Sequence, residues 1–395
     1  MYLSDKFLSI ESSPTLAIDS KFKQMKADGL DVVGFGAGEP DFDTPEHIKQ
    51  AAIEAIKKGA TKYTPASGTM ELKKAVCNKF ERDNGLDYSP TQIVVSNGAK
   101  QALINALGAI LNPGDEVVIP APYWVSYTEM VKYNDGIPVI LNTHEENDFK
   151  FTAEELDSVI TPKTRALILN SPSNPTGMIY TKDELEKIKD VVLKHGIYVV
   201  SDEIYEHLIY DGQKHTSIAS LGDDIKDLTI VINGVSKTYA MTGWRIGFTA
   251  SNEKIAKLMG NIQSHTTSNP NSIAQAAAVA ALNGPTGELE KMKKAFDERR
   301  CYMVERINSI DGVSCIKPHG AFYVMMNISH FIGKKIAGRE IKSANDFAEA
   351  FLEKCLVAVV PCNGFAAPAY IRWSYATSME NIKEGLDRLE KFLAM

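Results

Sequence analysis

Several polar residues that could do chemistry each follow a short apolar run of the sequence within a few positions. They are Asn174 in "SPSNPTG", Asp202 and Tyr205 in "SDEIY", Lys237 in "GVSKT", and the segment 96–101, "SNGAKQ". Apolar runs of this length are typical of strands that are covered on both faces of a parallel sheet. Ligands bind beyond the carboxyl ends of such strands. We therefore expect these residues to line one crevice.

Each of these residues also has an ordinary structural explanation. Asp202 could cap the N-terminus of a helix, and Asn174 could be a turn residue before Pro175. Ser236 could bond the local backbone, and Lys237 could extend into solvent, as a single lysine usually does. The coincidence of polar residues after consecutive strands is what favours a functional site.

A lysine, an aspartate and an anion site together are what catalysis with pyridoxal phosphate requires. The lysine amine binds the cofactor aldehyde, the aspartate holds the proton of the pyridine nitrogen, and other donors bind the phosphate. Lys237 lies among small and neutral residues, whose burial around it would keep the amine uncharged below its usual pKa of about 10.4. Arg245, a short distance along the chain, offers a planar fork of donors for a phosphate.

Two glycine-containing segments are candidates for binding phosphate groups. "NGAKQAL" is typical of a strand-to-helix turn, in which the backbone amides of Gly98, Ala99 and Lys100 would face an anion at the helix N-terminus. "GFGAG" at 34–38 superficially resembles a dinucleotide loop, but the full fingerprint is absent. Acidic residues such as Glu39 follow it and would repel a pyrophosphate, so a nicotinamide cofactor is disfavoured.

Strand and helix patterns alternate from about residue 44 to 285. The candidate strands are 92–96, 116–120, 166–170, 197–201, 229–233 and 246–250. Among the helices between them, one is expected from an N-cap at Thr44 to a stop at Gly59, and another begins with Thr181 and Glu184 as a capping box. This alternation predicts an α/β fold with a mainly parallel sheet.

We expect a large domain over 46–285 and a small α+β domain formed by 1–45, which includes an N-terminal arm, and 286–395. After "LNGPTG" come a long charged helical stretch, the strands "FYVMM" and "VAVV", and a closing helix. The apolar residues of that helix repeat at helical spacing. They are Ile382, Leu386, Leu389 and Phe392 or Leu393.

The composition narrows the classes of function. The chain has 395 residues, a net charge of −7 and no block rich in lysine and arginine, so we expect neither nucleic acid nor a membrane surface as a partner. Its longest apolar stretches, such as 275–282, are shorter than the roughly 18 residues that span a bilayer. The five cysteines form no CxxC pair and no leader pattern opens the chain, so we expect a cytoplasmic protein, and we expect no metal.

The motifs together resemble the class I, fold-type I pyridoxal-phosphate aminotransferases, and within them the bacterial aspartate aminotransferases. The matching segments are "AGEPDFDTP", "KYTPASG", "NGAKQAL", "PYWVSY", "SPSNPTG", "SDEIYEHL", "SKTYAMTGWRIG" and "IRWSYATS". They extend from about residue 15 to 378. The resemblance implies a large domain whose mainly parallel, mixed sheet lies between helices, with a smaller α+β domain beside it.

The resemblance also implies catalytic roles. Lys237 would be the Schiff-base lysine and the proton shuttle, and Asp202 would bind the pyridine nitrogen. Tyr205 and Asn174 would lie near the phenolic oxygen of the cofactor. Trp124 in "PYWVSY" would stack on the cofactor ring, although a tryptophan near a strand end could equally belong to the core. Trp124 and Asn174 would also contact the substrate.

For the phosphate, the resemblance implies binding by Ser236 and Arg245 together with the turn at Gly98. Tyr63 in "KYTP" resembles the tyrosine that reaches the phosphate of the neighbouring subunit's cofactor, which implies a homodimer with shared active sites. Taken alone, Tyr63 is simply an aromatic residue in a loop.

For the substrate, Arg372 in "IRWSY" resembles the arginine that binds the α-carboxylate, with Gly38 beside it, although an arginine at a strand start is more often on the surface. Lys100 and Thr15 match positions near the distal carboxylate of a dicarboxylic substrate. Relatives that also use prephenate carry a basic residue near the N-terminal arm, where this chain has Glu11, a departure that argues against prephenate as the main substrate.

The resemblance implies transfer of the amino group of L-aspartate to 2-oxoglutarate in a ping-pong reaction. A preference for aromatic amino acids, alanine or prephenate, a β-elimination lyase, and a non-catalytic sensor fused to a DNA-binding module are the alternatives. The first two would keep the same lysine, aspartate and arginine and differ in the lining of the pocket. The sensor is disfavoured by the acidic net charge and the short segment before "GEPDFDTP".

Overall fold

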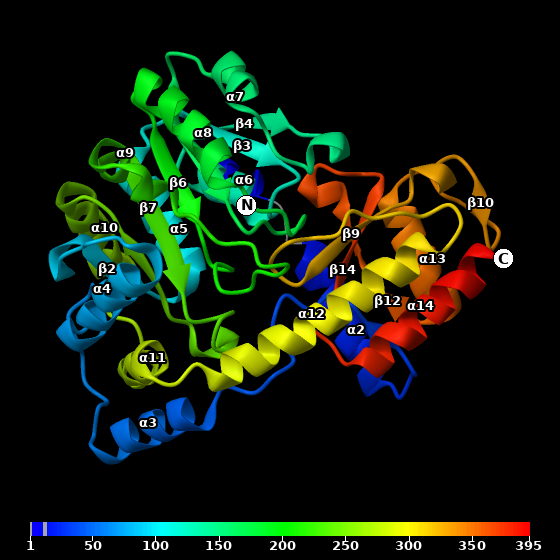
Figure 1. Ribbon diagram of the computed structural model, residues 1–395, viewed down its shortest axis with the longest axis horizontal. Helices are drawn as coiled ribbons and strands as arrows, with labels where there is room; N and C mark the ends of the chain where they lie inside the picture. The colour runs from blue at the N-terminus through cyan, green and yellow to red at the C-terminus, as the bar shows by residue number, and fades with distance from the viewer. Residues whose placement is uncertain (1, 11–13) are drawn as a thin grey trace.

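The computed structural model describes residues 2–10 and 14–395. At its centre is a seven-stranded sheet with the order β2-β8-β7-β6-β5-β3-β4 (Figure 1). The strands are β2 (Ile93–Ser96), β3 (Glu116–Ala121), β4 (Ile137–Asn142), β5 (Thr164–Asn170), β6 (Tyr198–Asp202), β7 (Thr229–Gly234) and β8 (Gly247–Ala250). In this sheet β8 runs antiparallel to its neighbours β2 and β7, and the other pairs are parallel. The predicted mainly parallel sheet is confirmed.

All six predicted strands are present, and the sequence analysis missed β4. This strand lies at the edge of the sheet, contains Pro138 and exposes Ile137, which is 46% accessible. Proline within an apolar run argues against a central strand, and it is tolerated here because an edge strand leaves one side of its backbone unpaired.

Helices cover both faces of the sheet. Val117 and Ile119 of β3 pack with α5 (Gly98–Ile110), α6 (Ser126–Tyr133) and α10 (Glu253–Thr266), whereas the intervening Val118 packs with the opposite layer. That layer contains α7 (Ala153–Val159), α8 (Lys182–His195) and α9 (Asp223–Leu228), and it continues over β2 and β8 as α3 (Glu46–Lys57), α4 (Met70–Asn84) and α11 (Ser272–Asn283). Burial on both faces explains the uninterrupted apolar strands.

The helix-start predictions had different outcomes. The capping box at Thr181 is confirmed at the start of α8. The predicted N-cap Thr44 is wrong, because α3 begins after Pro45. The Thr44 hydroxyl instead donates to the carbonyl of Ala240 at 2.7 Å and accepts from the Trp244 indole at 3.0 Å. It therefore ties the segment before α3 to the loop that follows β7.

Residues 287–395, here called the C-terminal unit, pack beside the sheet around a core that also includes Val33 and Phe35 near the N-terminus and residues of the segment 204–210 after β6 (Figure 1). Its main elements are α12 (Gly287–Asn308), β9 (Tyr323–Asn327), α13 (Ala344–Cys355), β13 (Val360–Pro361), β14 (Tyr370–Ser374) and α14 (Met379–Leu393), with β9, β13 and β14 in one sheet. The shorter elements are β10 (Lys335–Ile336), β11 (Arg339–Glu340) and β12 (Val357–Ala358). The apolar residues predicted on the inner face of α14 are buried.

The N-terminal segment contributes α1 (Asp5–Leu8), α2 (Pro14–Ala27) and β1 (Val33–Gly34), and β1 pairs with β12. The division into domains 46–285 and 1–45 with 286–395 stays a prediction. In the described part of the chain, no helix combines the length and the apolar character needed to cross a membrane.

The segment after β6 joins the sheet to the C-terminal unit. Ile209 forms a β-bridge with Gly320, and the backbone NH of Tyr210 donates to the C-terminal unit as well. Arg300 of α12, whose side chain is fully buried, binds both carboxylate oxygens of Asp211 at 2.7 Å. This bidentate pair links the segment after β6 to the C-terminal unit.

Candidate active site

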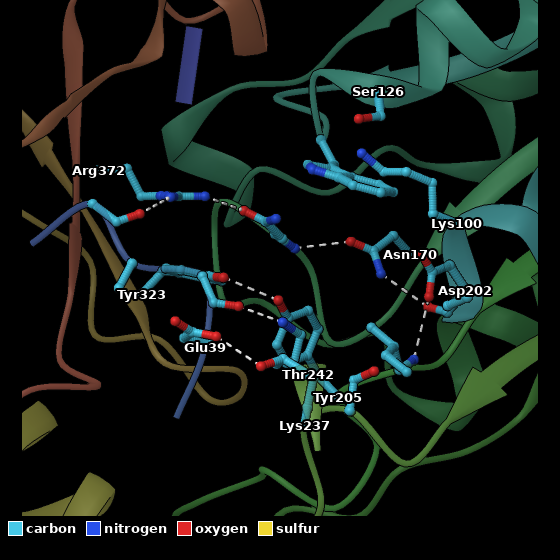
Figure 2. A pocket seen from close by; sticks show the side chains of 18 of the residues that line it. Glu39, Lys100, Ser126, Asn170, Asp202, Tyr205, Lys237, Thr242, Tyr323 and Arg372 are labelled. Carbon is cyan, nitrogen blue, oxygen red and sulfur yellow. Dashed lines mark hydrogen bonds between the residues drawn. The ribbon is translucent and has the colours of Figure 1, made fainter. Parts of the chain in front are cut away.

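A cavity of about 480 Å³ lies beyond the carboxyl ends of β5, β6 and β7, and the C-terminal unit forms its opposite wall. Figure 2 shows Asp202, Lys237 and Arg372 around the same space. The predicted site residues that line it are Gly38, Ala99, Lys100, Trp124, Asn174, Asp202, Tyr205, Ser236, Lys237, Arg245 and Arg372. The expectation that the strand ends face one crevice is confirmed.

Asp202 ends β6 and is buried in the cavity wall. The Tyr127 hydroxyl donates to its Oδ2 at 2.7 Å, and the Ile204 backbone NH donates to Oδ1 at 3.3 Å. Burial disfavours the charged carboxylate and raises the pKa of Asp202 to about 6, although these two hydrogen bonds act in the opposite direction. No helix starts at Asp202, so the explanation of this residue as an N-cap is wrong.

Lys237 follows β7, and its side chain points into the cavity rather than into bulk solvent (Figure 2). Burial lowers the pKa of its amine from 10.5 to about 8; the nearby Glu39 carboxylate opposes this change, and the Arg245 guanidinium adds to it. The amine donates a hydrogen bond to the carbonyl of Gly38. An uncharged lysine amine is a nucleophile and a base, so the environment prepares Lys237 for both roles.

The start of α5 lies directly against the Arg245 guanidinium. Gly98 has a φ of +78°, and a Cβ at this position would collide with the Arg245 guanidinium, whose Cζ would lie 2.8 Å away. The unpaired backbone NH groups at the start of α5 and the Arg245 side chain therefore converge on one corner of the cavity. The loop holds Arg245 there, because its Nη1 donates to the carbonyl of Thr242 at 2.9 Å.

Lys100 and Trp124 lie together on the cavity wall. The Lys100 amine is 4.9 Å from the centre of the Trp124 ring, an arrangement that attracts a cation to the ring face. Burial lowers the pKa of Lys100, and the charge of Arg245 adds to the effect. Trp124 is half-buried, lines the cavity and packs against the core next to α5, whereas its stacking on a cofactor ring stays a prediction.

Arg372 projects from β14 and is only 2% exposed, so the explanation of this residue as a surface arginine is wrong. Its Nη1 donates to Asn174 Oδ1 at 2.9 Å, and its Nη2 donates to the carbonyl of Gly36 at 3.1 Å. Its Nε is buried without a hydrogen-bond partner among the described residues. Both bonded groups are neutral, so the guanidinium charge is left for an anion to balance.

Asn174 and Tyr205 connect the strand ends with the C-terminal unit. Asn174 lies in a turn, as expected for a residue before proline, and its backbone NH donates to Asn170 Oδ1 at 2.8 Å. The side chain of Asn170 in turn donates to the carbonyl of Asp202 at 2.9 Å. On the other side, the Tyr205 hydroxyl lies 3.0 Å from the hydroxyl of Tyr323 (Figure 2).

A buried ion pair supports the strand that carries Lys237. Lys79 of α4 pairs with Glu206, and both side chains are 3% exposed. Burial would raise the pKa of Glu206, but the ammonium of Lys79 lowers it to about 2. Glu206 also accepts from Asn233 of β7 at 2.7 Å, and Asn233 Oδ1 accepts from the Gly234 backbone at 2.8 Å. These bonds fix the end of β7 just before the lysine.

Three predicted site residues are not among those that line the cavity: Gly98, which lies next to Arg245 at the start of α5, Tyr63 and Thr15. Tyr63 lies in the loop between α3 and α4 with 91% of its surface exposed. The side chain of Thr15 and the whole of Glu11 lie outside the described residues. Ser236 lines the cavity and is buried, and Gly38 lies where a Cβ would approach the Tyr323 hydroxyl to 3.3 Å.

Some residues of the site were missed by the sequence analysis. Asn170 carried a usable signal, because it is the polar last residue of a predicted strand. Tyr127 and Tyr323 were indistinguishable from core aromatic residues, and nothing local in the sequence indicates that their hydroxyls face Asp202 and Tyr205. The contact between Thr242 and Glu39, with the hydroxyl donating at 2.7 Å, joins segments that are far apart in the sequence.

A lysine of lowered pKa, a buried carboxylate, an anion corner and an unbalanced arginine within one α/β cleft define a site for amino-group chemistry on anionic substrates. The family model described as "Aminotransferase class I and II" matches residues 30–389. The chain therefore belongs to the class I and II aminotransferases, a family that uses pyridoxal phosphate, and the protein is an aminotransferase.

Individual relatives agree with this assignment. The chain is similar to the aspartate aminotransferase of Geobacillus stearothermophilus, with 49% identity over 100% of this chain and 99% of that protein. It is 49% identical to the aspartate/prephenate aminotransferase of Cereibacter sphaeroides, over 100% and 99% of the two chains. The crystal structure of the aspartate aminotransferase from Rhizobium meliloti superposes with a TM-score of 0.96 at 45% identity, covering 100% and 99%. The fold-type I architecture is thus confirmed.

Proposed function

We propose that the protein is a pyridoxal-phosphate-dependent aminotransferase that moves the amino group of L-aspartate to 2-oxoglutarate, giving oxaloacetate and L-glutamate by a ping-pong mechanism. The observation that carries the proposal is the content of one cavity. It holds Lys237 with a pKa lowered to about 8, the buried carboxylate of Asp202, and the buried guanidinium of Arg372.

The cavity residues fit pyridoxal phosphate in both space and charge. Because Gly98 has no side chain, the Arg245 guanidinium can lie directly against the start of α5, and we assign both to the cofactor phosphate. Asp202 offers a carboxylate to the ring nitrogen, and Lys237 offers an amine to the aldehyde. When bound, the cofactor supplies an electron sink that makes the Cα proton of an amino acid acidic. Ser236, which lines the cavity near Lys237, is proposed as a further phosphate donor.

Each side chain then binds, orients or moves a proton. Arg372 holds the substrate α-carboxylate with a guanidinium that Asn174 and Gly36 orient. The amine of Lys237 is half uncharged near pH 8, and it accepts the Cα proton and returns it to another carbon. Asp202, with a pKa of about 6, is ionised at neutral pH and holds a positive charge at the cavity wall.

Further contacts orient the cofactor ring. We assign the hydroxyl of Tyr205 and the amide of Asn174 to the side of its phenolic oxygen. Trp124 is proposed to stack on the ring and to border the substrate. Gly38 is proposed to lie beside the α-carboxylate, where a larger residue would meet the Tyr323 hydroxyl.

A dicarboxylic substrate is supported by the charge of the cavity wall. Lys100 lines the cavity on the side of Trp124, away from Arg372, and its ammonium would attract a distal carboxylate. Thr15 is proposed as a second group for that carboxylate. The names of the relatives from Geobacillus stearothermophilus and Rhizobium meliloti support aspartate as the amino donor.

The quaternary structure is part of the proposal. Tyr63 is almost fully exposed, and Ile56 of α3 and Met70 of α4, the helices on either side of its loop, each expose 55% of their surface. We propose a cytoplasmic homodimer in which Tyr63 reaches the phosphate in the neighbouring subunit. Light scattering tests this directly, and a monomer at micromolar concentration would contradict it.

Transamination of prephenate is the second candidate, because the relative from Cereibacter sphaeroides carries that activity in its name. A half-reaction screen distinguishes the candidates: the holoenzyme is mixed with each amino acid, and the loss of its visible absorption band is followed. Aspartate and glutamate should react fastest, and prephenate is then offered as acceptor. Reaction with tyrosine or alanine but not with aspartate would overturn the proposed substrate.

A further inference from the structure

Tyr323 contacts two parts of the proposed site, Arg372 on the substrate side and Tyr205 on the cofactor side, and it has no role in the proposed function. It is the first residue of β9, is only 1% exposed, and lines the cavity. On the paired strand β14, Arg372 lies opposite Met325 and Ser374 lies opposite Tyr323. Tyr323 and Arg372 are therefore diagonal neighbours on the same face of the sheet, a separation that an aromatic and a long side chain can bridge.

The ring of Tyr323 supports the arginine. The Arg372 Cζ lies 4.3 Å from the centre of the Tyr323 ring. At this distance a guanidinium is attracted to the ring face, and the attraction is strongest where water is excluded, as it is for these two buried side chains. With Nη1 and Nη2 bonded to neutral oxygens, the ring fixes the plane in which the unbonded Nε is presented.

The hydroxyl of Tyr323 reaches the other half of the site. It lies 3.0 Å from the hydroxyl of Tyr205, and the two rings meet nearly edge to face at 79°. Each hydroxyl has a single proton to donate. If Tyr205 donates its proton towards the cavity, Tyr323 must donate to Tyr205, and such a chain strengthens each of its hydrogen bonds.

We propose that Tyr323 is a positioning residue that couples the carboxylate-binding Arg372 to the hydroxyl of Tyr205. This inference rests on the proposed function, since it assigns Arg372 to the substrate carboxylate and Tyr205 to the cofactor. Its ring presents the arginine to the substrate, and its hydroxyl orders the proton of Tyr205. Binding of a carboxylate to Arg372 therefore affects the hydrogen bond that Tyr205 donates on the cofactor side of the cavity.

The chain offers a matched control in Tyr210. Tyr210 is 3% exposed, its ring lies 4.6 Å from the Cζ of Arg300, and its hydroxyl donates to the carbonyl of Ala321 at 2.6 Å. Tyr210 thus has the same kind of contacts as Tyr323 but does not line the cavity. The variants Tyr323→Phe, Tyr323→Leu, Tyr210→Phe and Tyr210→Leu can be compared in the holoenzyme.

Three quantities are measured for each variant: the melting temperature, the midpoint pH of the visible absorption band, and the dissociation constant of succinate from its perturbation of that band. Succinate is a four-carbon dicarboxylate without an amino or oxo group. Tyr323→Phe should raise the midpoint by on the order of half a pH unit, because a weaker hydrogen bond from Tyr205 favours the protonated chromophore. Its succinate dissociation constant should change less than about threefold, since the ring stays in place.

Tyr323→Leu should raise the midpoint similarly and, by removing the ring, should increase the succinate dissociation constant about tenfold or more. The Tyr210 variants should lower the melting temperature while leaving both other quantities unchanged. If the Tyr323 variants behave like the Tyr210 variants, the coupling role is overturned and the proposed function stands. If the wild-type holoenzyme shows neither a visible band nor a response to succinate, both proposals fail.

Discussion

Arg372 gives the most discriminating prediction, because its charge is buried without an ion-pair partner in the described part of the chain. It is 2% exposed, and its two hydrogen bonds go to Asn174 and to the carbonyl of Gly36. Arg372→Met replaces the guanidinium with an apolar chain of similar length. This variant should therefore change the free energy of unfolding less than it changes the binding of a carboxylate ligand.

The magnitudes follow from these contacts. Each hydrogen bond to a charged group contributes about 1.5–3 kcal/mol, and burying the ion costs several kcal/mol. The two terms nearly cancel, so the ligand-free variant should unfold within about 2 kcal/mol of the wild type. Losing a buried charge-assisted pair with a carboxylate costs about 2–5 kcal/mol, which is roughly 30-fold to several-thousand-fold in the dissociation constant of succinate.

The assay compares urea unfolding of the ligand-free protein with succinate titration of the holoenzyme. Arg300→Met is the matched control, because Arg300 is also fully buried but is paired with Asp211 and Asp297. That variant removes the bidentate bond to Asp211, which keeps Lys317, and the bond to Asp297, so it should lose more stability than Arg372→Met. Arg300 does not line the cavity, so the variant should still bind succinate. Wild-type succinate affinity in Arg372→Met would refute the assignment of Arg372 to the substrate.

The other predictions concern the lysine and the anion corner. Lys237→Ala should abolish labelling by pyridoxal phosphate and borohydride while the protein stays folded. The control Lys254→Ala, which changes an exposed lysine, should label normally. Mass spectrometry of peptides locates the label, and a label on another residue would contradict the assignment. Because the pKa of Lys237 is lowered from 10.5 to about 8, the unfolded chain binds this proton more tightly than the folded one. The free energy of unfolding of the cofactor-free protein, measured by urea titration, should therefore rise from about pH 8 to 10.5, and Lys237→Ala should lose that rise. The same pH profile in the variant and the wild type would show that the amine is not buried. Gly98→Ala should reduce retention of pyridoxal phosphate on dialysis, because its Cβ would displace Arg245. The control Gly85→Ala, at a glycine that also has a positive φ but has open space around it, should retain the cofactor. Equal retention in the two variants would show that the start of α5 and Arg245 do not bind the phosphate.

The position of the site was predictable because it follows from the periodicity of buried strands. Once the runs before Asp202 and Lys237 are identified as parallel strands, the geometry of the sheet brings their carboxyl ends to the same edge. The side of the cavity formed by the C-terminal unit was not predictable in the same way. Arg372 and Tyr323 reach the cavity through the antiparallel pairing of β9 and β14, and residue spacing alone does not determine that register.

Polar residues with tertiary roles account for the remaining differences. Thr44 has the sequence context of an N-cap, yet its hydroxyl bonds Ala240 and Trp244, which lie on the loop between β7 and β8. Local preference is a weak determinant where a long-range partner is available. Tyr127 gave no signal at all, because its apolar ring satisfies the core pattern and only the position of its hydroxyl shows that it faces Asp202.

The same burial that prepares the site also destabilises the cofactor-free chain. Raising the pKa of Asp202 from 3.8 to about 6 costs stability at neutral pH, because the folded state disfavours the charged carboxylate. Lowering the pKa of Lys237 from 10.5 to about 8 costs stability below pH 8 for the corresponding reason. Each shift of more than two units corresponds to about 3 kcal/mol. A ligand that brings a positive ring nitrogen to Asp202 and an aldehyde to Lys237 relieves both costs, so cofactor binding and folding stability are linked through these two residues.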